Sequence, residues 1–232
     1  MSIFQFKYFS IQQNNSTLKV GTDAMVLGAL VHGNYQTILD IGTGTGVLAL
    51  MLKQKNVHSK VLAIDIDDQA LLDCKVNFEN STWSGDLNCK REDIFTFDSS
   101  QLFDCIVCNP PYYENGLLSS SEALNRAKHT SDFSLESLFT KVKSLLTAKG
   151  NFWVILPVEN AEKWFVYCEN IQLYVQEHIT IYGKPNFPKR IVMKMGTESL
   201  PTDKKHFVIR DNENVYTEEY RKLTLEFHNK KI

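Results

Sequence analysis

The sequence has few of the residues that mark several large classes of protein. It has 11 glycines and 6 prolines among 232 residues, and 43% of its residues are hydrophobic, which excludes low-complexity, collagen-like and disordered chains. The longest apolar runs, such as Phe152 to Leu156, are far shorter than the roughly 18 residues that span a bilayer. The N-terminus alternates polar and apolar residues and lacks the apolar block of a signal peptide. We therefore expect a soluble, cytoplasmic protein.

Cysteine is too scarce and too scattered for a disulfide framework, because the five cysteines are an odd number and widely spaced. Cys105 and Cys108 form a CxxC, but they fall in the run Phe103 to Cys108, which is typical of a buried strand. Residues three apart on a strand point to opposite faces. We therefore expect structural thiols there and no metal site.

The sequence also lacks a large excess of charge of one sign, because it has 25 Lys and Arg and 27 Asp and Glu, for a formal net charge of -2. A nucleic-acid partner usually leaves a basic footprint, so the total argues against one. The charge is uneven, however: net -6 over residues 1–183 and net +4 over residues 184–232. This asymmetry indicates two surfaces with different partners.

Strand and helix signals alternate along the chain. We expect strands at 37–41, 60–65, 87–90, 103–108 and 151–156, and helices at 23–31, 47–53, 68–80 and 135–146. Strands separated by helices predict a parallel sheet, which binds its ligand at the carboxyl ends of its strands. Two long strands, 171–182 and 190–195, joined by a loop at 183–188 without a helix between them, predict an antiparallel hairpin. A strand at 205–210 and a helix at 217–227, capped by Thr217, follow.

No repeat and no Pro/Gly/Ser-rich linker divides the chain. We expect one domain over residues 1–232, with an N-terminal strand and helix extension at 1–36, a core at 37–196 and a C-terminal strand and helix at 197–232.

Three glycines lie within five residues, between the strand at 37–41 and the helix at 47–53: Gly42, Gly44 and Gly46. Glycines in this setting permit a tight turn and close approach of a ligand to the backbone, and the helix N-terminus adds N–H groups. The G-x-G-x-G spacing is shorter than the dinucleotide motif G-x-G-x-x-G. Asp40 precedes the loop, and the alternative interpretation is a packing turn in which this residue caps the helix.

Two further acids follow the next two strands. Asp65 lies 21 residues after Gly44, where a carboxylate accepts both hydroxyls of a ribose. Asp93 follows the strand at 87–90. We expect it to reach the amino group of an adenine while Ile94 packs on the adenine ring. The alternative for Asp93 is a solvated loop carboxylate.

The tetrapeptide Asn109-Pro110-Pro111-Tyr112 directly follows the strand at 103–108. Two successive prolines fix φ and remove two N–H donors, so the loop presents carbonyl oxygens and the Asn109 side chain as acceptors. Such a loop can accept two hydrogen bonds from a planar amine while Tyr112 stacks on the ring that carries it. The alternative is an ordinary strand-ending turn.

Together these motifs resemble the class I S-adenosylmethionine-dependent methyltransferases that act on exocyclic amino nitrogens. The resemblance implies a Rossmann-like α/β fold: a mainly parallel seven-stranded sheet with an antiparallel last hairpin and helices on both faces. It implies that S-adenosylmethionine is held by Asp40, the glycine loop, Asp65, Asp93 and Ile94, and that Asn109 and the Pro110 carbonyl hold the target amine. The reaction would be an in-line displacement catalysed by positioning, without a metal or a covalent intermediate.

Three classes of amine substrate remain: nucleobases of RNA, adenine or cytosine of DNA, and the glutamine amide of release factors. The glutamine enzymes carry a helical domain before the glycine loop, where this chain has 39 residues that begin as strands. The DNA enzymes generally need a target-recognition domain, for which little chain remains after Leu156. We therefore favour RNA.

The flanks are similar to the bacterial tRNA1(Val) adenine-37 N6-methyltransferase family, over residues 4–11, 18–29, 109–116, 126–130, 208–210, 216–221 and 223–224. The resemblance implies methylation of the adenosine adjacent to the anticodon of a valine tRNA, with the base splayed out and stacked on Tyr112. Two positions depart from the family pattern: Lys128 stands where arginine is common, which weakens any bidentate phosphate contact, and Phe227-His228 replaces an aromatic pair.

Several residues are candidates for closing over the cofactor or contacting RNA. Lys19 and Thr22 belong to a segment, 19–23, that we expect to act as a lid over the cofactor, although Asp23 could equally cap the following helix. Arg126, Lys128 and His129 form one candidate RNA-facing loop. The best basic patch has no acid within it and Phe187 interleaved: Lys184, Lys189, Arg190 and Lys194. For both sets the alternative is a solvated surface.

Other functions remain open. They are a ribosomal-RNA base amino-methyltransferase, a release-factor glutamine methyltransferase and a non-catalytic RNA-binding module. A dinucleotide oxidoreductase is disfavoured, because the Asn-Pro-Pro-Tyr loop has no role in one.

Overall fold

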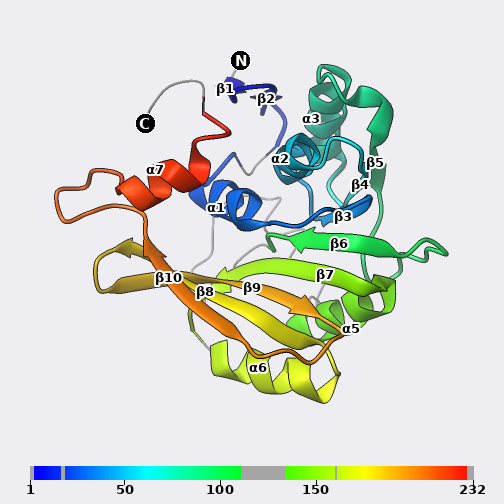
Figure 1. Ribbon diagram of the computed structural model, residues 1–232. Coiled ribbons are helices and arrows are strands. Elements are labelled where there is room, and N and C mark those ends of the chain that lie inside the picture. The colour runs from blue at the N-terminus through cyan, green and yellow to red at the C-terminus, as the bar shows by residue number, and fades with distance from the viewer. Residues whose placement is uncertain (1–2, 17–18, 111–133, 160, 229–232) are drawn as a thin grey trace.

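An eight-stranded sheet organises the molecule, seen here in a computed structural model that describes residues 3–16, 19–110, 134–159 and 161–228 (Figure 1). The strands are β3 (Thr37–Ile41), β4 (Lys60–Asp65), β5 (Leu87–Arg91), β6 (Phe103–Cys108), β7 (Leu146–Pro157), β8 (Tyr174–Lys184), β9 (Phe187–Gly196) and β10 (Asp203–Val208). Their order is β10-β8-β9-β7-β6-β3-β4-β5. The pairs β5–β4, β4–β3, β3–β6 and β6–β7 are parallel, β9 is antiparallel to both β7 and β8, and β10 is parallel to β8.

Helices cover both faces of this sheet. One face carries α1 (Thr22–Leu30), α2 (Val47–Lys55), α3 (Asp68–Glu79) and α7 (Glu218–Thr224), and the other carries α5 (Leu135–Leu145) and α6 (Ala161–Asn170). A short 3-10 helix, Ser84–Asp86, precedes β5, and β1 (Ile3–Gln5) pairs with β2 (Ser10–Gln12) as a separate antiparallel ribbon. Figure 1 shows α1, α2 and α7 above the sheet and α5 and α6 below it. In the described ranges no helix is long and apolar enough to cross a membrane.

The two faces of the sheet bury two separate hydrophobic cores. Strand residues alternate between them because successive side chains point to opposite faces. On β6, Cys105 packs in the core under α1 and α2, whereas Cys108 packs in the core under α5. Both thiols are free and buried. The expectation that this CxxC consists of structural thiols on opposite faces is confirmed.

The expected α/β order is confirmed, with the strands at 37–41, 60–65 and 103–108 matching residue for residue. Thr217 caps α7 by accepting a hydrogen bond from the Tyr220 backbone N–H. The predicted antiparallel hairpin is also present, as β8 and β9. The main sheet has an eighth strand, because β10 adds to the outer side of β8.

One element was missed and one local expectation was wrong. The helix α6 was not predicted, because its Trp, Phe, Val and Tyr residues favour strands by propensity; in the structure it packs Cys168 against the sheet. The connection from β8 to β9 is also shorter than the predicted loop at 183–188. Pairing continues to Lys184 and Phe187, so only Pro185 and Asn186 form the turn.

The ends of the parallel strands define the functional edge of the sheet. Ile41 at the end of β3 pairs with Cys108 at the end of β6. Pro157 at the end of β7 pairs with Arg190 near the start of β9. We call the side on which β3 to β7 end the carboxyl edge. The glycine loop, Asp65 and Asn109 all follow strands that end there.

Candidate active site

The glycine loop leaves β3 in a left-handed backbone conformation, with φ of +67° at Gly42, +55° at Gly44 and +82° at Gly46. Residues with a side chain rarely adopt these angles. The backbone N–H groups of Gly42 and Thr43 both donate to the carbonyl oxygen of Ile64, at 2.9 and 3.1 Å. These two bonds fasten the start of the loop to β4.

The three glycines have different surroundings. A Cβ atom added at Gly42 or Gly44 would meet no atom of the described residues within 4 Å, so these residues leave this side of the loop open. A Cβ at Gly46 would lie 2.7 Å from Phe78 Cε1 and 2.9 Å from Cys74 Sγ. Gly46 is therefore required for packing of the loop on α3, while Gly42 and Gly44 leave bare backbone that a ligand can approach.

Asp65 contacts the backbone of the glycine loop. Its Oδ2 accepts the backbone N–H of Gly44 at 2.8 Å, and its Oδ1 accepts the N–H of Asp67 at 2.9 Å. Burial raises the pKa of this carboxyl, and the hydrogen bonds from Asp67 and Gly44 lower it. Each carboxylate oxygen can accept a further hydrogen bond, which suits a pair of vicinal hydroxyls.

Asp40 lies beneath the loop and is fully buried. Its Oδ2 accepts the Thr43 hydroxyl at 2.6 Å and the Ala49 backbone N–H at 3.1 Å, so it joins the loop to the first turn of α2. Its Oδ1 has no hydrogen-bond partner among the described residues. Burial raises the pKa of Asp40 to about 7. Its contacts are those of the helix-capping interpretation, and it braces the loop from below.

Asp93 and Ile94 lie next to Asp65 along the carboxyl edge, because the Glu92 N–H donates to the Asp65 carbonyl at 3.0 Å. The Asp93 carboxylate accepts the Phe95 N–H at 2.9 Å, which holds the turn after β5. Ile94 is 6% exposed and packs in the core under α5. This arrangement leaves Asp93 half-buried near Asp65.

Asn109 and Pro110 follow β6 directly and lie beside the glycine loop. Because Ile41 pairs with Cys108, the next residues on the two strands, Gly42 and Asn109, are neighbours at the edge. Asn109 is half-buried and Pro110 is buried. Pro111 and Tyr112, the rest of the predicted tetrapeptide, lie outside the described residues.

The expected lid segment leads into α1 at the same edge. Lys19 and Thr22 are exposed. The cap of α1 is Gly21, so the alternative in which Asp23 caps this helix is wrong. Asp23 instead accepts a 2.8 Å hydrogen bond from Nε of Arg190 at the start of β9. This ion pair fixes the first turn of α1 to the carboxyl edge.

Two buried polar residues of α3 were missed from the sequence. Asn77 Nδ2 donates to the carbonyls of Gln12 and of Thr45 in the glycine loop, both at 2.9 Å, and its Oδ1 accepts the Gln12 N–H at 2.7 Å. Asp73 Oδ2 accepts the N–H groups of Asn15 and Ser16. The available signal was two polar residues one helical turn apart, beside the apolar stripe of α3. They tie the N-terminal segment to the loop.

The predicted basic patch divides into two parts. Arg190 is paired with Asp23, and Lys194 is paired with Glu177 at 3.3 Å and lies 5.6 Å from the centre of the Trp153 ring. Arg190 and Lys194 therefore have carboxylate partners within the protein, and the RNA-facing role of the patch stays a prediction. Lys184 and Lys189 are exposed at the tip of the hairpin. The other predicted RNA-facing residues, Arg126, Lys128 and His129, lie outside the described residues.

Comparison with known proteins gives the same picture. The model of the Methyltransferase small domain family matches residues 15–163. A protein of a Flavobacteriaceae bacterium named tRNA1(Val) (adenine(37)-N6)-methyltransferase is 34% identical, and the match covers 98% of this chain and 99% of that protein. A protein of the same name from Vibrio vulnificus is 32% identical over 97% of this chain and 95% of its own length.

Solved structures share the fold at low sequence identity. A predicted O-methyltransferase of Agrobacterium tumefaciens superimposes with a TM-score of 0.69 at 14% identity, covering 88% of this chain and 96% of that one. A putative RNA methyltransferase of Pyrococcus horikoshii gives a TM-score of 0.53 at 14% identity, covering 75% of this chain and 78% of that one. These likenesses establish a Rossmann-like methyltransferase fold.

Proposed function

Because the chain belongs to the tRNA1(Val) (adenine(37)-N6)-methyltransferase family, we propose that it transfers a methyl group from S-adenosylmethionine to N6 of adenosine 37 in a valine tRNA. The single observation that carries the proposal is the meeting of an open glycine loop, Asp65 and Asn109-Pro110 at one edge of the sheet. Cofactor acceptors and amine acceptors are thereby adjacent. We propose the cytoplasm as its location, where tRNA is the substrate.

The residues present fit S-adenosylmethionine. The open backbone at Gly42 and Gly44 leaves room for a ligand against the loop. Asp65 retains acceptor capacity for the two ribose hydroxyls, and Asp93 for the adenine amino group. Asp40 Oδ1 is a buried acceptor without a partner among the described residues, and an acidic site suits a cationic ligand. When bound, S-adenosylmethionine supplies an electrophilic methyl group on a positively charged sulfur.

The role of Asn109 and Pro110 is to orient the target amine. An exocyclic amino group has two hydrogens, and we assign one to the Asn109 side-chain oxygen and one to the Pro110 carbonyl. With both hydrogens held, the nitrogen lone pair points out of the ring plane toward the cofactor side of the edge. Fixed orientation of this kind replaces a bimolecular encounter and is worth several orders of magnitude in rate. No residue forms a covalent bond to the base.

The test is methylation of an unmodified valine tRNA transcript with tritiated cofactor, followed by mass spectrometry of the nucleosides. We expect N6-methyladenosine, and no label in a transcript whose adenosine 37 is replaced by guanosine. Label in ribosomal RNA or in a release factor, with none in tRNA, would overturn the proposal.

A variant series tests the amine-binding role. Asn109→Ala is expected to lower kcat by at least about 100-fold while cofactor affinity stays within a factor of two, because the lost bond serves orientation. Asn109→Asp keeps an acceptor and should retain more activity than Asn109→Ala. Asn88→Ala, an exposed asparagine on β5, is the matched control and should behave as the wild type.

A further inference from the structure

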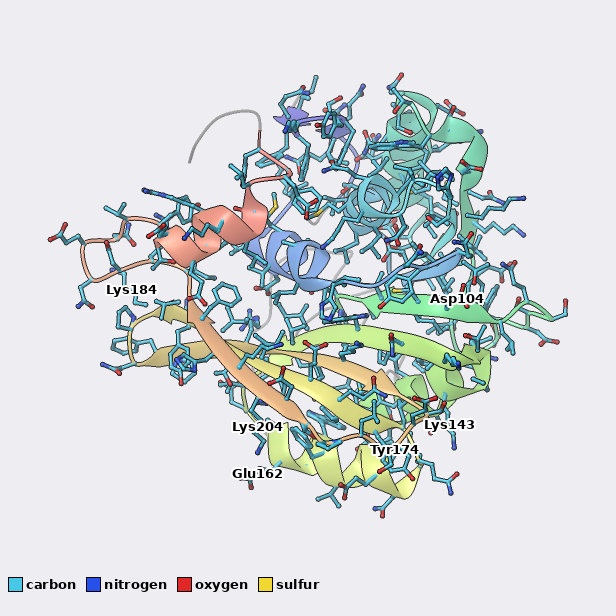
Figure 2. All side chains as sticks on the ribbon, in the orientation of Figure 1. Asp104, Lys143, Glu162, Tyr174, Lys184 and Lys204 are labelled. Carbon is cyan, nitrogen blue, oxygen red and sulfur yellow. The ribbon has the colours of Figure 1, made fainter. Side chains whose placement is uncertain are left out.

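The β8–β9 hairpin extends past the rest of the sheet on the carboxyl edge. The last residue of β7, Pro157, pairs with Arg190, whereas pairing between β8 and β9 continues to Lys184 and Phe187. Figure 1 shows the turn beyond the end of β7. Figure 2 shows Lys184 at this tip, on the opposite side of the view from Asp104, which lies near the start of β6. The tip therefore overhangs the edge that bears the candidate active site.

The strand order puts the hairpin on the substrate side of that site. Asp65 and Asp93 follow β4 and β5, on one side of Asn109, while β7 and then β9 lie on the other. Two strand spacings separate β9 from β6, or about 10 Å. A base held at Asn109 would have its neighbouring nucleotides within reach of the hairpin tip, away from the cofactor half of the edge.

The tip presents an aromatic ring next to a cation. Phe187 is 67% exposed, although large apolar side chains are usually buried. It is the cross-strand partner of Lys184, so the two side chains share one face of the ribbon. The stem of Lys189 lies across the backbone at Gly183, at 3.3–3.6 Å from the position of an added Cβ. Lys184 and Lys189 are both exposed and lie within three residues of Phe187 along the hairpin.

The positive charge of the tip is uncompensated. No acidic residue occurs between 181 and 190, and among the described residues neither Lys184 nor Lys189 belongs to an ion pair. The inner cations of the same strand, Arg190 and Lys194, are both paired with carboxylates. Of the four cations of the described hairpin named above, the two without an ion pair are therefore those nearest its tip.

The ring is held on a rigid support. Pro185 and Asn186 form the turn, and Pro188 follows Phe187 directly. Asn186 has a φ of +66°, in the left-handed region that asparagine tolerates. On the other side of β8, the Arg210 N–H donates to the Gly183 carbonyl, which adds a third strand to the ribbon. The Arg210 guanidinium stacks on Tyr216 at 3.8 Å. A preorganised ring needs little ordering on binding.

We propose that the tip of the β8–β9 hairpin is a docking site for the single-stranded anticodon loop of the tRNA, in which Phe187 stacks on an unpaired base and Lys184 and Lys189 contact phosphates. The inference rests on the proposed function, because it takes RNA as the substrate. An exposed aromatic ring flanked by free cations is the combination that binds single-stranded nucleic acid. One ring is too small an apolar area for a stable protein interface, which buries about 800 Å² per partner.

Binding of fluorescently labelled tRNA transcript, measured by anisotropy without cofactor, tests the docking site. Phe187→Ala should raise Kd at least about fivefold, since base–aromatic stacking is worth about 1–3 kcal/mol. Phe187→Tyr keeps the ring and should bind as the wild type, whereas Phe187→Leu keeps only apolar character and should weaken binding as alanine does. Equal affinity of the Leu and wild-type proteins would overturn the stacking role.

A charge comparison tests the phosphate contacts. Lys184→Ala/Lys189→Ala should reduce the slope of log Kd against log salt concentration by about two, one for each lost contact. The matched control is Lys60→Ala/Lys149→Ala, which removes two exposed lysines at the amino end of β4 and near the start of β7. Equal slopes for the two double variants would overturn the contacts.

Two readouts separate failure of this inference from failure of the proposed function. If the wild type methylates tRNA but the tip variants bind and methylate it equally well, the docking site is wrong and the function stands. If the wild type methylates a release factor and not tRNA, both fail. Cofactor affinity of every tip variant should equal that of the wild type, because the tip lies outside the cofactor half of the edge.

Discussion

The backbone N–H of Gly44 donates a 2.8 Å hydrogen bond to Oδ2 of Asp65. This bond couples the backbone of the glycine loop to the end of β4. The carboxylate that we propose as the ribose acceptor therefore also shapes the loop.

Asp65→Ala should raise the Kd for S-adenosylmethionine about 10- to 100-fold, because it removes a charged acceptor and releases the loop. Isothermal titration calorimetry measures the change. Asp68→Ala is the control: Asp68 is 67% exposed and pairs only with Arg91, at 3.2 Å, so this variant should bind as the wild type. Unchanged affinity in Asp65→Ala would remove Asp65 from the cofactor site.

Gly44→Ala and Gly46→Ala should separate binding from stability. Both create a left-handed alanine, which costs about 1–2 kcal/mol. At Gly44 the new methyl group meets no atom of the described residues and would project into the proposed ligand space, so cofactor affinity should fall more than stability. At Gly46 it overlaps Phe78 and Cys74, so unfolding in urea should show the larger loss of stability. The reverse ranking would mean that ligand space lies elsewhere.

The stability of the protein should depend on pH through Asp40. Burial raises its pKa from 3.8 to about 7, so between these values the folded state binds more protons than the unfolded state. The free energy of unfolding should therefore fall as pH rises through this window, by at most about 1.4 kcal/mol per unit. Asp40→Asn does not titrate but still offers an acceptor to Thr43 and Ala49.

The measurement is urea unfolding of the wild type and Asp40→Asn at several pH values. Relative to the wild type, the variant should gain stability between about pH 4 and pH 7 and keep a constant advantage above that range. Parallel stability curves for the two proteins would show that Asp40 does not titrate in this window.

The ion pair between Arg190 and Asp23 should contribute to the free energy of unfolding. Their side chains are 23% and 28% exposed, so the pair is partly shielded from water. In a double-mutant cycle, Asp23→Ala and Arg190→Ala should show a coupling of about 1 kcal/mol, measured by urea unfolding. Additive effects would contradict the pair. Arg190→Ala should also alter the salt dependence of tRNA binding less than Lys184→Ala/Lys189→Ala does.

Much of the site could be predicted from the sequence because short runs of adjacent residues indicate it. A strand that ends in glycines, a second that ends in Asp65 and a third that ends in Asn109 predict the edge, since parallel strands end together. The helix α6 was not readable, because its aromatic residues favour a strand until packing against the sheet decides. The strand at 205–210 was predicted, but its place as the eighth strand of the main sheet depends on pairing with β8, which propensity does not encode.

The sequence by itself determined the α/β order, the glycine loop and the acids that follow β4 and β5, because these depend on periodicity and on residues adjacent in the chain. Only the tertiary structure decided which of these groups face a ligand and which are committed to the protein. It buried Asp40 beneath the loop, opened Gly44 and closed Gly46. It also paired Arg190 and Lys194 with carboxylates, whereas Lys184 has no ion pair within the part of the chain that the structure describes. Burial and ion pairing depend on contacts between residues far apart in sequence, and these contacts cannot be predicted from the pattern of residues along the chain.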